Sequence, residues 1–319
     1  MKYRFGLNEK KYAVFKQNFK IYRIKNYTFA VRKYKKEIKK MKISRKSLIL
    51  CSLMVFAFSS CRQKTIRTID KSDVEKFYLA TDTSKGSLSI ELNVQIPVCF
   101  DDEKVLDSIR NTIISNLFGL EYVKFENDSL LKHFTTDLKT EYKLTNEPIL
   151  TEMDDNSLYS FNNEHILDGF SLLSDEHIYS YGINRYVFMG GAHGLNTINY
   201  LNFNLKNGKI ITESDLFMKN SSKKLTELIK KRIVEQSLED KSSEPIKNLS
   251  TTDYWSDAIK PNGNFYITDE GINYVYNPYE IGPYYLGITE VRLPYNRLKS
   301  ILKQNSLVSY LIRKEKIEK

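Results

Sequence analysis

The stretch SLSIELNVQIPVC, residues 87–99, is the clearest element of the sequence and decides how the fold begins. Its apolar side chains occupy every second position: Leu88, Ile90, Leu92, Val94, Ile96 and Val98. Such strict alternation is typical of a β-strand that buries one face. The next stretch, DDEKVLDSIRNTIISNLFG (101–119), instead repeats apolar residues at four-residue steps, opens with acids and ends at a glycine. That pattern predicts a capped amphipathic helix.

The rest of the chain mixes short strands with isolated helices. We expect helices over 129–142, 221–240 and 296–303, and strands over 166–173, 178–189, 264–268, 272–276 and 289–295, with a hairpin turn at KNGK (206–209). Because strands and helices do not alternate regularly, the pattern predicts an α+β fold and not a doubly wound sheet. We expect a small N-terminal α+β domain (86–185), a mixed-sheet α+β domain (186–305) and a charged tail (306–319).

One apolar run interrupts a polar N-terminal region. SLILCSLMVFAF (47–58) has about a dozen residues, against the roughly 20 that a membrane-spanning helix needs. Basic residues precede the run in MKISRK (41–46), and Ser59 and Ser60 follow it. This order of basic, apolar and small segments predicts a secretion signal over 41–60.

Cys61 comes directly after the small residues, and this arrangement resembles the lipobox of bacterial lipoproteins. In those proteins the signal is cut before the cysteine, and lipid is attached to its sulfur. The resemblance implies a membrane anchor on Cys61 of the mature chain. Phe58 departs from the aliphatic residue that the strictest pattern has three positions before the cysteine.

Residues 1–40 are strongly basic. We expect them to be an upstream mis-start before a true initiator at Met41, with a cytoplasmic basic tail as the alternative. They carry a charge of +12 and residues 41–60 carry +3, whereas the whole chain carries +10, so the chain from Cys61 onward has −5. The basic character therefore belongs to the segments before Cys61, and we expect no nucleic-acid partner.

The polar residues 61–85 predict a tether between the anchor and the folded part. The positions of the three cysteines agree with an exported protein. Cys51 would leave with the signal and Cys61 would carry lipid, so only Cys99 remains and no intramolecular disulfide can form. We expect Cys99 to be a small core hydrophobe at the end of its strand.

Common catalytic and cofactor motifs are absent from the sequence. It has no nucleophile elbow, phosphate loop or dinucleotide-binding glycine pattern. No two histidines lie four residues apart, so a helical two-histidine zinc site cannot form from sequence neighbours. A site assembled from different strands remains an alternative, with Glu164, His165, Glu176 and His177 as its members. Polar residues on exposed strand faces explain that grouping better, so we expect no metal and no cofactor.

FMGGAHGLN (188–196) is the main exception. Gly190, Gly191 and Gly194 allow positive φ and close approach of the backbone, and His193 between them is a candidate proton carrier or ligand. A glycine-rich turn between two strands, with His193 bonded to neighbouring backbone, would give the same sequence. Both interpretations stay open at this point.

The segments 188–217 and 265–302, with their Gly-Gly-Ala-His-Gly and PYEIGPYYLG elements, resemble the uncharacterised C-terminal domain of a family of extracytoplasmic proteins. That family includes a lysozyme-sensing anti-sigma factor and the non-catalytic part of a peptidoglycan deacetylase. The resemblance covers roughly 186–303 and implies an envelope-facing α+β module, without an activity. We expect this chain to have a removable signal where the sensor has a membrane helix, and its sequence lacks the His-x-x-x-His pair of the deacetylases.

The loop YNPYEIGPYYLG (276–287) supplies the other candidate ligand-binding residues, which are Tyr279, Glu280 and Tyr284. Tyrosine rings suit sugar stacking or protein contact, and Glu280 can hydrogen-bond a ligand. Aromatic residues in and beside strands also serve the core, so we expect most tyrosines of this region to pack.

Together these observations favour a lipid-anchored, non-enzymatic binding protein of the bacterial cell envelope. CRQK (61–64) carries no acidic cluster, so we place it on the periplasmic side in preference to the surface. The resemblance implies lysozyme or cell-wall material as the ligand. The alternative is an envelope hydrolase or metal-dependent enzyme in which His193 works with a carboxylate such as Glu280. A third hypothesis is a structural envelope component, which an exposed apolar patch would support.

Overall fold

The computed structural model of the chain describes residues 64–79, 86–150, 161–239 and 246–315. The chain divides into two compact units, residues 1–60 and 61–319, and every described residue belongs to the second unit. The basic segment 1–40, the signal at 41–60 and Cys61 therefore lie outside the described residues. The expectations about them stay predictions.

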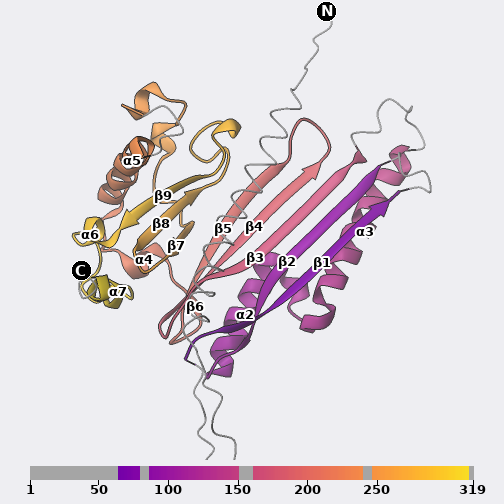
Figure 1. Cartoon of the computed structure of the whole chain (residues 1–319), viewed down its shortest axis with the longest axis horizontal. Coiled ribbons are helices and arrows are strands. Elements are labelled where there is room, and N and C mark those ends of the chain that lie inside the picture. The colour runs from indigo at the N-terminus through magenta and orange to yellow at the C-terminus, as the bar shows by residue number, and fades with distance from the viewer. Residues whose placement is uncertain (1–63, 80–85, 151–160, 240–245, 316–319) are drawn as a thin grey trace, which may run out of the picture. The chain divides into compact units, whose positions relative to one another are not determined.

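The larger of two sheets has six strands in the order β1-β2-β3-β4-β5-β6 (Figure 1). These strands are β1 (Arg67–Tyr78), β2 (Ser87–Cys99), β3 (Asn163–Ser174), β4 (Ile178–Met189), β5 (Leu195–Asn204) and β6 (Lys209–Ile210). β2 and β3 run parallel, and the other neighbours run antiparallel. The stretch 87–99 forms β2 as predicted, and its alternate side chains from Leu88 to Ile96 are buried.

Two helices connect β2 to the parallel strand β3, as a parallel pair requires. They are α2 (Glu103–Leu117) and α3 (Asn127–Leu150), which pack against β1 and β2. The predicted inward positions of α2 are buried, and the Oδ1 of Asp102 accepts a hydrogen bond from the Val105 backbone N–H at 3.1 Å. α3 extends past the predicted range 129–142 and contains Pro148.

β1 corrects the prediction of a tether over 61–85. It pairs antiparallel with β2 from Arg67 to Tyr78. Its face toward α3 is mostly polar and is satisfied by side chains of that helix. The pairs are Lys71 with Asp128 (2.5 Å), Asp73 with Thr135 (2.6 Å) and Glu75 with Lys139 (2.7 Å). Hydrophobic alternation cannot reveal a strand whose inward face is held by polar pairs, and this is why the tether prediction was wrong here.

The smaller sheet is antiparallel, in the order β7-β8-β9. Its strands are β7 (Phe265–Ile267), β8 (Gly271–Tyr276) and β9 (Thr289–Pro294), and the helices of this region are α4 (Glu213–Leu216), α5 (Ser222–Glu239), α6 (Tyr295–Leu298) and α7 (Ser309–Glu315). α5 packs on β9 and buries Leu225, Ile229 and Ile233 as predicted. The helix expected over 296–303 is only the short α6. The expected charged tail instead contains α7, and Val308 and Leu311 are buried there.

Asparagine side chains join the two sheets where main-chain pairing stops. The Oδ1 of Asn264 accepts from the backbone N–H of Tyr200 at 3.0 Å, and its Nδ2 donates to the carbonyl of Ile198 at 2.8 Å. The Oδ1 of Asn277 accepts from the backbone N–H of Ile198 at 2.7 Å. These amides imitate the donor and acceptor of a neighbouring strand, and so satisfy the outer edge of β5.

Asn202 makes the same kind of link from β5 toward β7. Its side chain is buried, its Nδ2 donates to the carbonyl of Phe265 at 2.7 Å, and its Oδ1 accepts from the backbone N–H of Ile267 at 3.1 Å. The same Oδ1 accepts from the Ser180 hydroxyl at 2.7 Å. The β4–β5 hairpin is therefore fixed to the smaller sheet by directional bonds as well as by packing.

The predicted α+β fold is confirmed. Each sheet has its own hydrophobic core, and a small cluster of Ile198, Tyr200 and Val275 lies between them. The boundary expected between residues 185 and 186 falls inside β4, which pairs with β3 and β5, so the sheets divide only after β6. Within the described ranges, no helix combines the length and apolar character that crossing a bilayer requires.

Candidate functional site

The structure brings together the two segments that the sequence singled out. The Gly-Gly-Ala-His-Gly loop connects β4 to β5, and it meets the loop that follows β8. The rings of His193 and Tyr284 stack with centroids 3.8 Å apart and planes 18° apart. The Tyr284 hydroxyl donates to the Gly194 carbonyl at 2.6 Å. Residues about 90 positions apart therefore form one local surface.

The glycines of this loop have two different roles. Gly190 and Gly191 have φ of 85° and 89°, in the left-handed region that favours glycine. Gly194 is needed for space, because a Cβ there would lie 2.5 Å from Cζ and Oη of Tyr186. The loop can therefore turn sharply and still lie directly on a buried tyrosine ring.

Tyr279 completes the exposed part of this surface. It is 52% exposed, and its ring centroid lies 5.7 Å from that of Tyr284. Its φ is 71°, a conformation that costs energy for a residue with a side chain and that is enriched at functional sites. We call His193, Tyr279 and Tyr284 the aromatic ledge.

Glu280 supports the ledge and does not work with His193. Its Oε1 accepts from Nδ2 of Asn277 at 3.1 Å, and its Oε2 accepts from Nδ2 of Asn262 at 2.8 Å. In the described part of the chain, the His193 ring has one hydrogen bond, between Nδ1 and the Gly194 carbonyl at 3.3 Å. Among the described residues His193 and Glu280 share no hydrogen bond, so the pairing named in the alternative hypothesis is not formed, and Glu280 instead fixes the loop that carries Tyr279.

The Tyr284 phenol of the ledge is held in its protonated form. Partial burial, with the nearby Tyr279, holds the pKa of Tyr284 above its ordinary value. The Tyr284 phenol therefore stays protonated and keeps its donor for the Gly194 carbonyl. What the ledge offers a partner is aromatic area with polar edges, and aromatic area of this kind contributes strongly to binding.

The other tyrosines of this region divide between core and surface. Tyr274 and Tyr276 are fully buried, as expected for packing residues, whereas Tyr285 is 67% exposed and donates to the carboxylate of Asp253. Sequence reasoning missed Trp255, which is 48% exposed and whose backbone N–H donates to the Ile281 carbonyl at 2.8 Å. The sequence could have singled out Trp255, because it is the single tryptophan of the chain and lies in a polar stretch.

The alternative site from Glu164, His165, Glu176 and His177 does not assemble into a metal centre. No group of three or more histidine, cysteine, aspartate or glutamate side chains in the described ranges could hold a metal ion. Desolvation by burial lowers the pKa of His165, and the ring of His177 packs edge-on against Tyr310 at 4.5 Å.

Cys99 is the last residue of β2, where it is half-buried and its Sγ accepts from Nη2 of Arg67 at 3.0 Å. It is thus less enclosed than the small core hydrophobe that the sequence suggested.

Comparison with known proteins divides the chain in two. Residues 214–296 match a family described as a protein of unknown function, DUF3298, and residues 83–196 match the family described as deacetylase PdaC. The ledge draws on both regions, since His193 lies in the second match and Tyr279 and Tyr284 in the first. We expected the Gly-Gly-Ala-His-Gly element to belong to the C-terminal domain. It instead falls in the PdaC match.

Solved structures of the DUF3298 family resemble this chain. A member from Bacteroides fragilis is 25% identical, with a TM-score of 0.70 over 78% of this chain and 99% of that one. A DUF3298 family protein from Pseudomonas aeruginosa is 16% identical, with a TM-score of 0.47 over 75% of this chain and 95% of that one. No curated protein matches the chain. The chain therefore carries regions similar to DUF3298 and PdaC, on a fold like that of the B. fragilis protein.

Proposed function

We propose that the chain is a lipid-anchored, non-enzymatic binding protein of the bacterial cell envelope, which engages cell-wall material through the aromatic ledge. The observation that carries this proposal is the exposure of Tyr279 on a backbone held in an unfavourable conformation. A turn from Asn277 to Glu280, closed by the Glu280 N–H to the Asn277 carbonyl at 3.1 Å, sets this φ. Glycine or asparagine suits such a position better than tyrosine, and recognition of a ligand gives a reason for a half-exposed aromatic ring there.

The rigidity of the ledge supports a binding role. Asn262 and Asn277 clamp both oxygens of Glu280 beside Tyr279, and the Tyr284 hydroxyl is bonded to the opposite loop. A ring held in this way loses little conformational freedom when it binds, so more of its contact energy appears as affinity. Exposed aromatic faces of this kind suit the stacking of sugar rings or contact with a protein.

The location in the envelope rests on three further observations. The match to the deacetylase PdaC family is consistent with an extracytoplasmic, cell-wall related protein. The order of basic, apolar and small residues before Cys61 supports secretion and a lipid on that cysteine. The absence of acids in CRQK (61–64) supports the periplasmic side.

The test is a calorimetric titration of residues 62–319 with soluble peptidoglycan fragments and, separately, with lysozyme. We expect saturable binding of the fragments, weakened at least about tenfold in Tyr279→Ala, which corresponds to about 1.4 kcal/mol. Tyr78→Ala is the matched control, because Tyr78 is an exposed tyrosine on β1, away from the ledge.

The outcomes show which of the two ligands binds and whether the ledge is the binding surface. Binding of lysozyme alone would assign the ledge to a protein ligand and overturn the cell-wall proposal. If a folded protein gives no heat with either partner, or if the two tyrosine variants bind equally well, the ledge is not the binding surface.

A further inference from the structure

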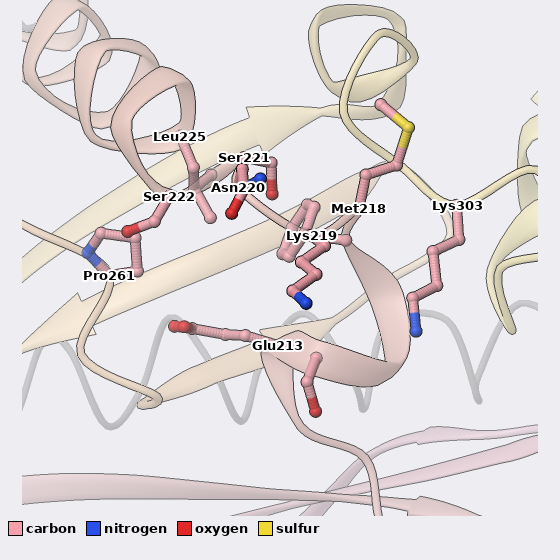
Figure 2. Close-up of a pocket in the computed structure, with 11 residues that line it drawn as sticks. Glu213, Met218, Lys219, Asn220, Ser221, Ser222, Leu225, Pro261 and Lys303 are labelled. Carbon is pink, nitrogen blue, oxygen red and sulfur yellow. The ribbon is translucent and has the colours of Figure 1, made fainter.

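A pocket of about 380 Å³ lies beside the first turn of α5, in a part of the chain that the aromatic ledge does not use (Figure 2). Its volume is within the range of small-molecule sites, roughly 300–1,000 Å³. The pocket wall includes α4, the residues between α4 and α5, Pro261 and Lys303.

The pocket has an apolar wall. Phe217 is 4% exposed and Leu225 is 2% exposed, so the core holds both side chains in place, and Pro261 lines the same space. An apolar side chain that covers this wall would leave water and gain free energy in proportion to the area it buries.

Backbone pairing keeps the pocket open in one shape. The backbone N–H of Met218 donates to the Ile301 carbonyl at 2.8 Å, and that of Lys303 donates to the Leu216 carbonyl at 2.9 Å. These bonds hold Lys303 beside the segment that carries Lys219, although the two lysines are far apart in sequence. The site is therefore largely formed before any ligand arrives.

Charges of both signs line the same space without neutralising one another. Glu213 lies on α4, and in Figure 2 its carboxylate lies apart from the ammonium groups of Lys219 and Lys303. Among the described residues, neither lysine forms an ion pair with Glu213 or with any other acid. The backbone N–H of Gly263 donates to Oε1 of Glu213 at 3.0 Å, which fixes the carboxylate.

We infer that this pocket binds a short zwitterionic peptide. Its terminal carboxylate would lie between Lys219 and Lys303, its ammonium group at Glu213, and an apolar side chain against Phe217 and Leu225. Lysine offers only donors and an ionised glutamate only acceptors, so the two ends of such a ligand have opposite partners. A simple anion would have partners only at the two lysines and a simple cation only at Glu213, so only a ligand with both charges finds a partner at each of these groups.

The experiment is an NMR titration of residues 62–319 with dialanine, with N-acetyl-dialanine and with dialanine amide. We expect saturable shifts of pocket resonances with dialanine, and affinity at least about tenfold lower when either terminus is blocked. Glu213→Gln keeps an acceptor for Gly263, and Lys303→Gln removes one ammonium group. Each should also weaken dialanine binding about tenfold. Lys299→Gln, an exposed lysine outside the pocket, should not.

Three results would overturn the inference. The first is the absence of saturable binding to a folded protein. The second is equal affinity for dialanine and its acetylated form, which would mean that only an anion is recognised. The third is an equal effect of Lys299→Gln and Lys303→Gln, which would mean that general charge and not the pocket drives binding. Because none of these residues belongs to the aromatic ledge, the result is independent of the cell-wall proposal.

Discussion

Replacing Asn202 with alanine should destabilise the protein far more than its small change in volume suggests. Asn202 is 2% exposed, and its side chain is hydrogen-bonded to the Phe265 carbonyl, the Ile267 N–H and the Ser180 hydroxyl. The Ser180 hydroxyl can turn toward the Ile267 carbonyl, which is 3.5 Å away, so two backbone groups of β7 lose their partner. A buried polar group without a partner costs about 1–3 kcal/mol, and the expected loss is therefore about 2–6 kcal/mol.

Urea unfolding of residues 62–319, followed by circular dichroism, measures this loss. The control is Asn199→Ala, because Asn199 lies on the same strand with an exposed side chain. The control should change the free energy of unfolding by no more than about 0.5 kcal/mol. If Asn202→Ala and Asn199→Ala unfold at the same urea concentration with the same slope, the asparagine links are not what holds the two sheets together.

Three further predictions concern the β1 face, a buried phenol and the ledge. Thr135→Val removes the donor to Asp73 and should cost about 1–3 kcal/mol in urea unfolding, whereas Thr136→Val, on the exposed side of α3, should cost less than half as much. Burial raises the pKa of Tyr142 from 10.0 to about 12, so the folded state keeps a proton that the unfolded state loses, and the free energy of unfolding should fall as pH rises from 10 to 12. Tyr142→Phe should flatten that fall, and an unchanged slope would contradict the assignment. Gly194→Ala should push the loop away from Tyr186 and separate His193 from Tyr284, so the ring-current shift of the His193 protons in NMR spectra should shrink, and a retained shift would mean that the stack tolerates the added Cβ.

Elements that bury apolar side chains were predictable from the sequence. β2 and α2 are examples. In each, the spacing of the apolar residues predicts which face is buried, and both elements lie where expected. α3 and α5 follow the same rule with less certain ends, since helix ends depend on caps and fraying.

β1 was not predictable, because its inward side chains Lys71, Asp73 and Glu75 look like a solvated linker until α3 supplies their partners. The asparagine links between the two sheets were not predictable for the same reason, since their partners come from distant parts of the chain. Asn202, Asn264 and Asn277 read as turn or surface residues, and only the folded chain shows the strand edges that they satisfy.

The placement of the candidate site residues was predictable only in part. The sequence selected both loops of the ledge, but stacking between residues about 90 positions apart depends on the tertiary fold. It also assigned Glu280 a role toward a ligand, whereas both of its oxygens are taken by asparagines of its own region.

The presence of β1 changes how far the folded part can reach from a membrane. A flexible segment over 61–85 would span at most about 85 Å when extended, at roughly 3.4 Å per residue. The structure has a paired strand from Arg67 and buries Ile66 in the core, so a spacer could include at most the residues between Cys61 and Ile66, which span no more than about 17 Å. With a lipid on Cys61, the start of β1 would therefore stay close to the bilayer surface. The β4–β5 loop with the aromatic ledge lies at the other end of the sheet, beside the end of β1 and the start of β2, so the length of the sheet itself would hold the ledge away from the membrane.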